Sequence, residues 1–133
     1  MASKPLSPHL QVYRPQITSV MSIMHRGTGI FLSLGAFVLA YWLVALASGE
    51  SRFYEVRECF VWWPVPLLMI GWVFAFYYHL CNGIRHLFWD MGKGFELDTL
   101  TKSGIGVLAG ALILSIITLI AAMSIGACTS PPE

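Results

Sequence analysis

Charged residues are scarce in this 133-residue sequence, at 11% of the chain. A soluble domain carries about 25% charged residues, and a chain of this length buries only about two-thirds of its surface on folding. Because 56% of the residues are hydrophobic, a soluble fold would leave large apolar patches in contact with water. The composition therefore excludes an ordinary soluble domain. The net charge of +1 gives no reason to expect a nucleic-acid partner.

Cysteine is also scarce, with three residues and no C-x-x-C pair. An iron–sulfur cluster or a zinc site within this chain is therefore not expected. Cys81 lies in an apolar run and is interpreted as a small apolar residue. Cys59 and Cys128 are predicted on the same side of a membrane, and the sequence leaves open whether they form a disulfide.

Long apolar runs, by contrast, dominate the sequence. Three segments, at about residues 23–47, 63–89 and 104–128, are almost free of charge, and each exceeds the length of about 20 residues that a helix needs to cross a bilayer. We therefore predict an all-α membrane protein with three transmembrane helices. It forms a single domain over residues 1–133, with an irregular, proline-containing arm over residues 1–17. Too few residues remain outside the spans for a flavin or nucleotide domain, so any activity depends on a few side chains and on other subunits.

The distribution of basic residues predicts the orientation of these helices. The N-terminal arm and the second connecting segment share one side of the membrane, and that side carries six basic residues: Lys4, Arg14, Arg26, Arg85, Lys93 and Lys102. The other side carries Arg52 and Arg57. Since basic residues are enriched on the cytoplasmic side, the N-terminus is expected inside.

A histidine interrupts the second apolar segment. His79 lies six residues before Arg85, which places it roughly 9 Å deeper in a helix. One interpretation is a histidine that only hydrogen-bonds to a neighbouring helix. The other is an axial haem ligand, because ionisable groups at membrane depth are functional candidates and neutral imidazole binds iron. His25 is the only internal candidate for a second ligand, but it is expected nearer the surface, where it suits a haem propionate. We therefore expect the second ligand to come from another subunit.

Ser22, His25 and Arg26 form a second polar group, at the inner end of the first apolar segment. Spacings of three and four residues place them on one face of a helix. There a hydroxyl and a guanidinium can donate hydrogen bonds to a quinone carbonyl, and His25 can relay the protons that quinone reduction consumes. The alternative is that Arg26 extends toward lipid phosphates and that Ser22 bonds to its own helix.

Arg85 and Asp90 lie five residues apart at the inner end of the second segment. Two interpretations remain open: the two side chains neutralise each other, or Arg85 faces a haem propionate. The first interpretation places the guanidinium at the membrane interface.

Two motifs at these positions resemble the cytochrome b subunit of succinate dehydrogenase, the larger membrane anchor of respiratory complex II. The first combines PLSPHLQVYR at residues 5–14 with SIMHRGTG at residues 22–29, and the second is HLCNGIRHLFWDMG at residues 79–92. The family's first motif usually opens Arg-Pro, whereas here it opens Lys4-Pro5. The resemblance covers nearly the whole chain.

The resemblance implies a helical bundle shared with a second anchor subunit, in a complex with an iron–sulfur subunit and a flavoprotein subunit. It implies that His79 is an axial ligand of haem b, whose other ligand the second anchor supplies, and that His25 and Arg26 lie on the propionate side. It also implies that Ser22 and Arg26 line a ubiquinone site that receives electrons from succinate, in the tricarboxylic acid cycle and the aerobic respiratory chain. The chain alone is not expected to be catalytic. Only Met-Ala-Ser-Lys precedes Pro5, so a bacterial inner membrane is expected rather than a mitochondrial one.

Three alternatives stay open at this point. A fumarate reductase anchor of the same family would run the reaction in reverse, and a purely structural anchor would use the histidines only for packing. A transporter or channel subunit would spread polar residues across the membrane depth, whereas here they gather at one side.

Overall fold

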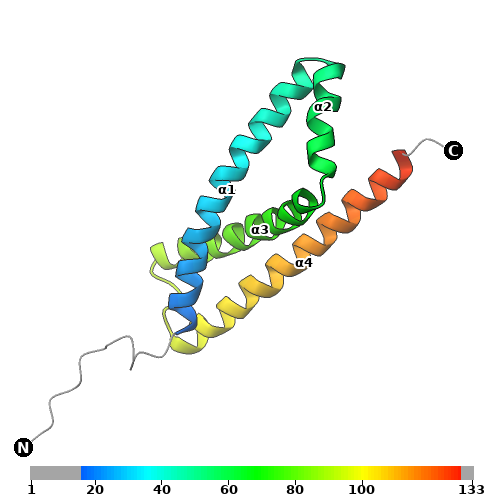
Figure 1. Ribbon diagram of the computed structural model, residues 1–133. Coiled ribbons are helices and arrows are strands. Elements are labelled where there is room, and N and C mark those ends of the chain that lie inside the picture. The colour runs from blue at the N-terminus through cyan, green and yellow to red at the C-terminus, as the bar shows by residue number, and fades with distance from the viewer. Residues whose placement is uncertain (1–15, 130–133) are drawn as a thin grey trace, which may run out of the picture.

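Figure 1 shows the structure, a computed structural model that describes residues 16–129, with side chains as far as residue 125. These residues form four helices: α1 (Ile17–Ala47), α2 (Glu50–Val61), α3 (Pro64–Asp90) and α4 (Leu97–Thr129). No strand occurs in this part of the chain. Helices α1, α3 and α4 are long and apolar enough to cross a membrane. The prediction of an all-α protein with three membrane spans is therefore confirmed.

Two of the spanning helices begin earlier than their apolar segments. α1 starts at Ile17, before its apolar segment begins near residue 23, and α4 starts at Leu97, before its segment begins near residue 104. Hydropathy marks the part of a helix that lies in hydrocarbon, whereas backbone hydrogen bonding continues the helix into the polar interface. Of the predicted arm over residues 1–17, the described residues include only Gln16 and Ile17, and Ile17 already belongs to α1.

Helix α2 has no counterpart among the predicted elements. Gly49 has a φ of 111°, a conformation that favours glycine, and it separates α2 from the end of α1. Val56 is 5% exposed, and the Phe53 ring meets Trp42 of α1 edge-on, with 5.8 Å between the ring centroids. The charged residues of α2 are exposed. α2 is thus a short amphipathic helix, which a search for long apolar runs does not detect.

The three spanning helices meet most closely at one end. The first turns of α1 and α4 lie near the last turns of α3, and α1 and α4 diverge toward the opposite end (Figure 1). The buried core includes Met21 of α1, Tyr78 of α3, and Val107 and Ala111 of α4. We call this region the convergent end, and the distribution of basic residues predicts that it faces inward.

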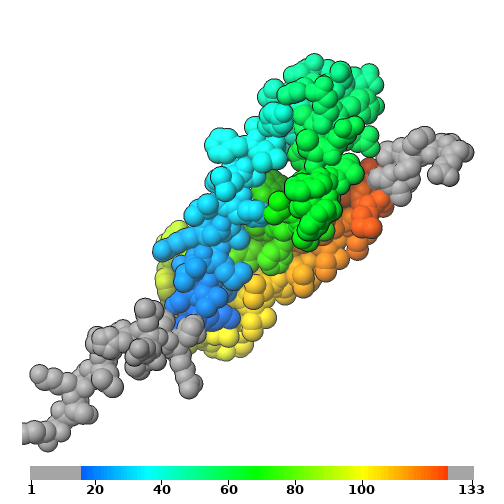
Figure 2. All heavy atoms as spheres, viewed as in Figure 1, coloured from blue at the N-terminus to red at the C-terminus, as the bar shows by residue number. Residues whose placement is uncertain are grey.

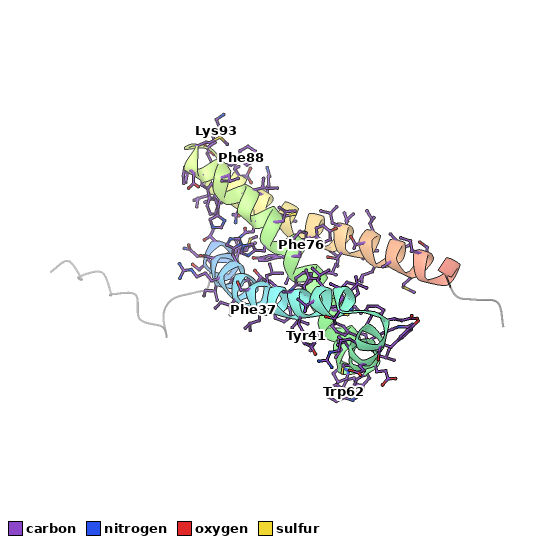
Figure 3. The ribbon with its side chains drawn as sticks, turned by 90° about the horizontal axis from the view of Figure 1, so that it is seen from above. Phe37, Tyr41, Trp62, Phe76, Phe88 and Lys93 are labelled. Atoms are coloured by element: carbon purple, nitrogen blue, oxygen red, sulfur yellow. The ribbon has the colours of Figure 1, made fainter. Side chains whose placement is uncertain are left out.

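Most large apolar side chains of the described residues remain exposed. Phe37, for example, is 75% exposed and projects from α1 away from α4 (Figure 3). Such a surface would associate in water, but in a bilayer lipid tails or helices of other subunits cover it. The exposed apolar surface is therefore that of a membrane subunit.

Close contact between α1 and α3 depends on Gly35. The indole ring of Trp72 on α3 occupies the space in which a Cβ on Gly35 would lie. Within a bilayer, helices associate through packing rather than through the hydrophobic effect, and small residues let their backbones approach. Gly35 therefore fixes how near α1 comes to α3 at this level.

Replacing Gly35 with alanine is expected to lower the stability of the chain in detergent. The added methyl group overlaps a rigid indole ring, so α1 and α3 must separate, at a cost of about 1–3 kcal/mol. Thermal unfolding followed by circular dichroism measures the effect. Gly71→Ala on α3 is the matched control, because a Cβ there meets no atom within 4 Å. Equal unfolding midpoints for the two variants would contradict the contact.

Candidate functional site

Three histidine rings stack where α1 meets α3. The ring of His25 lies over that of His79, with 3.9 Å between the centroids and 10° between the planes. It also stacks with His86, at 4.9 Å and 21°. We expected His25 nearer the membrane surface than His79, and this was wrong. The two rings stack face to face, so they lie at one level of the helix pair.

One turn of α1 fixes the orientation of the His79 ring. The His79 Nδ1 atom lies 3.1 Å from the carbonyl oxygen of His25 and 3.3 Å from the hydroxyl oxygen of Thr28. A carbonyl oxygen can only accept, so Nδ1 carries the proton and donates it to His25. The lone pair of the neutral ring is then on Nε2. A Cβ on Gly29 would lie 3.1 Å from His79 Cε1, so this glycine makes room for the ring.

The stacked histidines do not form a metal site by themselves. Among the side chains described, no group of three or more His, Cys, Asp or Glu residues could hold a metal ion. Rings that lie face to face present their nitrogen atoms side by side rather than toward a common point. A metal held at His79 would therefore need ligands beyond the described side chains of this chain.

Ser22 and Arg26 lie one helical turn apart on α1, next to His25. Ser22 is half-buried and Arg26 is exposed. Neither residue is among the side-chain hydrogen bonds or ion pairs found in the described part of the chain. Their hydrogen-bonding groups thus remain available to a ligand, and the quinone role given to them stays a prediction.

Arg85 does not pair with Asp90, and its other predicted role, toward a haem propionate, stays a prediction. Arg85 is 5% exposed, and its guanidinium donates hydrogen bonds to the Ser103 hydroxyl at 2.9 Å and to the Leu100 carbonyl at 2.7 Å. It also lies 4.3 Å from the Trp89 ring centroid and 3.6 Å from the Met21 sulfur. No ion pair with Asp90 occurs in the described residues. Because α4 begins at Leu97 rather than near residue 104, Leu100 and Ser103 lie on a helix within reach of this side chain.

Two buried polar residues of α3 were not among the predicted site residues. Tyr78 is fully buried, and its hydroxyl donates a hydrogen bond to the Met21 carbonyl at 3.0 Å. Asn82, one turn later, is also fully buried, and its side-chain amide has no hydrogen-bond partner within the described region. Burying an unpaired amide costs free energy. Both are polar residues within a segment predicted to span the membrane, and this feature of the sequence could have identified them as candidates.

The cysteines add no further chemistry to the described region. Cys59 is exposed and Cys81 is partly buried, and these two do not pair with each other. The side chain of Cys128 lies outside the described residues, so its pairing with Cys59 stays untested.

Comparison with known proteins gives a consistent result. The sequence model of the succinate dehydrogenase/fumarate reductase transmembrane subunit family matches residues 2–118. The succinate dehydrogenase cytochrome b556 subunit of Rickettsia conorii is 38% identical over 114 residues, which are 86% of this chain and 89% of the relative. That of Paracoccus denitrificans is 39% identical over 122 residues, or 89% of this chain and 91% of the relative. The mitochondrial succinate dehydrogenase cytochrome b560 subunit of Sus scrofa is 38% identical over 117 residues, or 86% of this chain and 69% of the relative.

The hydrogen bond between Arg85 and Ser103 predicts energetic coupling between α3 and α4. Arg85→Met and Ser103→Ala are each expected to destabilise the chain in detergent, by about 1–3 kcal/mol for the arginine. Because the two residues share one hydrogen bond, the double variant should lose less unfolding free energy than the two single variants lose together. The difference should be about 0.5 kcal/mol or more. Thermal unfolding of the four chains measures this coupling. Arg57→Met is the control for removal of an exposed arginine, and strict additivity would contradict the contact.

Proposed function

Since this chain belongs to the succinate dehydrogenase/fumarate reductase transmembrane subunit family, we propose that it is the cytochrome b anchor of a succinate dehydrogenase. It lies in a bacterial inner membrane and holds a haem b and part of a ubiquinone site. The observation that carries this proposal is the His79 ring, whose Nδ1 is bonded to the His25 carbonyl at 3.1 Å and whose Nε2 carries the free lone pair.

His79 fits the requirements of an axial haem ligand. Ligating histidines usually donate their second ring N–H to a carbonyl or carboxylate, which fixes the tautomer and makes the ligating nitrogen more basic. Here the His25 carbonyl and the Thr28 hydroxyl surround Nδ1. A haem bound at His79 supplies one-electron transfer. A bound porphyrin would also supply the further ligands that the described side chains do not provide.

The second axial ligand comes from the second anchor subunit. The His25 and His79 rings stack face to face, with 10° between the planes and 3.9 Å between the centroids, so their in-plane lone pairs cannot point at each other across one iron. His25 therefore supports His79 through its carbonyl and its ring face. Together with Arg26, it lies on the propionate side of the haem.

Ser22 and Arg26 bind the ubiquinone head group. The Arg26 guanidinium is exposed at the inner end of α1, and both side chains can donate hydrogen bonds to a quinone carbonyl oxygen. A charged donor stabilises the negative charge that reduction places on that oxygen. His25, three residues from Ser22, holds or passes a proton at the same surface.

Partner subunits complete the electron path to this site. The described residues contain no cluster-binding or flavin-binding fold, so electrons from succinate must arrive from iron–sulfur and flavoprotein subunits docked at the convergent end. The exposed apolar side chains of the spanning helices provide the contact with the second anchor. All three relatives described above are named for succinate dehydrogenase, which favours succinate oxidation over fumarate reduction.

Replacing His79 with leucine is expected to remove or displace the b-type absorption of the purified complex, because iron loses a ligand. A reduced-minus-oxidised spectrum measures it, with His86→Leu as the control, since His86 bonds to its own helix through Asn82. Gly29→Ala tests the same ligand with less disturbance. Its methyl group would lie 3.1 Å from the His79 ring and should shift the haem spectrum or potential, whereas Gly27→Ala, which meets no atom within 4 Å, should not. An unchanged spectrum for His79→Leu would exclude the ligand assignment.

Replacing Arg26 with leucine is expected to lower succinate:quinone reductase activity by about 10- to 100-fold, the loss that follows removal of a charged hydrogen bond. Succinate oxidation by an artificial acceptor and the haem content should persist, because electrons still leave the soluble subunits. Arg57→Leu, an exposed arginine on α2, serves as the control. Undiminished quinone reduction would contradict the assignment, and loss of both activities would indicate failed assembly.

A further inference from the structure

A pocket opens between α1, α2 and the start of α3, far from the histidines. It has a volume of about 460 Å³, within the range of about 300–1,000 Å³ that is typical of small-ligand pockets. Its lining consists of Val38, Tyr41, Arg52, Glu55, Val56, Cys59, Phe60 and Val65. Figure 2 shows the surface hollowed between α1 and α2.

The polar groups of this pocket gather at one edge. Arg52 donates a hydrogen bond to the Glu55 carboxylate at 2.7 Å and another to the Tyr41 hydroxyl oxygen at 3.3 Å. The carboxylate, as hydrogen-bond acceptor, raises the pKa of the Arg52 guanidinium, so this group keeps its charge. The remaining lining is mostly aliphatic and aromatic. The pocket thus has an apolar floor and a rim with one positive and one negative charge.

The position of the pocket is that of a membrane–water interface. α1 contributes from an apolar membrane span, and α2 contributes from a charged helix outside it. Trp62 and Trp63, which connect α2 to α3, are 66% and 73% exposed, and exposed tryptophans are enriched at the level of lipid head groups. A ligand here meets hydrocarbon on one side and head groups on the other.

We propose that this pocket binds one zwitterionic phospholipid of the phosphatidylethanolamine class, independently of the haem and the quinone. The lipid phosphate accepts hydrogen bonds from the Arg52 guanidinium and the Tyr41 hydroxyl, and the primary ammonium donates a hydrogen bond to the Glu55 carboxylate. An acyl chain covers the apolar floor between Val38 and Val65. The paired charges of Arg52 and Glu55 favour a zwitterionic lipid, because the Glu55 carboxylate would repel a purely anionic head group.

Arg52 and Tyr41 have the hydrogen-bonding capacity that this arrangement needs. A guanidinium carries five N–H donors, and the bonds to Glu55 and Tyr41 leave others for a phosphate. Tyr41 uses its oxygen as the acceptor from Arg52, so its own proton is free to donate. A primary ammonium can donate hydrogen bonds to a carboxylate, which a quaternary ammonium cannot.

Native mass spectrometry of the delipidated complex tests this inference. Phosphatidylethanolamine and phosphatidylglycerol are titrated separately, with soluble glycerophosphoethanolamine as the head group alone. The wild type is expected to bind one phosphatidylethanolamine more tightly than phosphatidylglycerol, and to bind the soluble head group undetectably. Equal binding of the two lipids, or no bound phospholipid because a partner subunit fills the pocket, would overturn the proposal.

Matched variants locate the site. Arg52→Gln should weaken phosphatidylethanolamine binding about tenfold or more, as expected for the loss of a charged hydrogen bond. Glu55→Gln should reverse the lipid preference, so that this variant binds phosphatidylglycerol more tightly than phosphatidylethanolamine. Arg57→Gln and Glu58→Gln change the same charges on α2 outside the pocket and should leave binding unchanged. Val38→Trp fills the floor while leaving the rim intact, and it should also remove the lipid. Equal affinities for Arg52→Gln and Arg57→Gln, or full binding by Val38→Trp, would overturn the assignment.

Discussion

The buried guanidinium of Arg85 is the interaction on which the arrangement of the membrane helices depends. It contacts the sulfur of Met21 on α1 and bonds to Leu100 and Ser103 on α4, while the Trp89 ring of its own helix covers it. Lipid tails are as apolar as leucine, so the hydrophobic effect does not hold helices together inside a bilayer. A charged group that must be satisfied within the protein therefore decides where three helices meet. The contacts of Arg85 account for the convergence of α1, α3 and α4 at one end.

The geometry at His79 follows from that convergence. Once α1 and α3 are held together, a single turn of α1 supplies the His25 carbonyl, the Thr28 hydroxyl and the open surface of Gly29 to one imidazole ring. The His79 ring is thus oriented mainly by the backbone carbonyl of His25 and by the space that Gly29 leaves open. The stacked His25 ring contributes less. Gly35 contributes at the next level, where the Trp72 ring rests on the α1 backbone.

The sequence predicts the parts of this structure that depend on composition and misses those that depend on contacts between helices. The three spans follow from uncharged runs of sufficient length, and His79 stands out because it interrupts one of them. α2 was missed because its apolar positions alternate with charges, as in any amphipathic surface helix. The contacts of Arg85 with Leu100 and Ser103 were missed because they join two helices and leave no spacing pattern in the sequence. Asn82 and Tyr78 carry no spacing signal, and only the packing of α3 between its neighbours shows that both are fully buried.

The composition of α2 has a consequence for the way the chain enters the membrane. This helix lies on the side opposite the convergent end, so in the orientation that the basic residues predict its charged residues are carried across the bilayer during insertion. Three glutamates and two arginines leave it with a net charge of −1, and the bond between Arg52 and Glu55 pairs opposite charges within one turn. With a membrane potential that is negative inside, outward movement of one negative charge is favoured by about 2.3 kcal/mol per 100 mV. The electric field therefore assists the export of the helical hairpin formed by α1 and α2, whereas a basic segment of the same length would be held back.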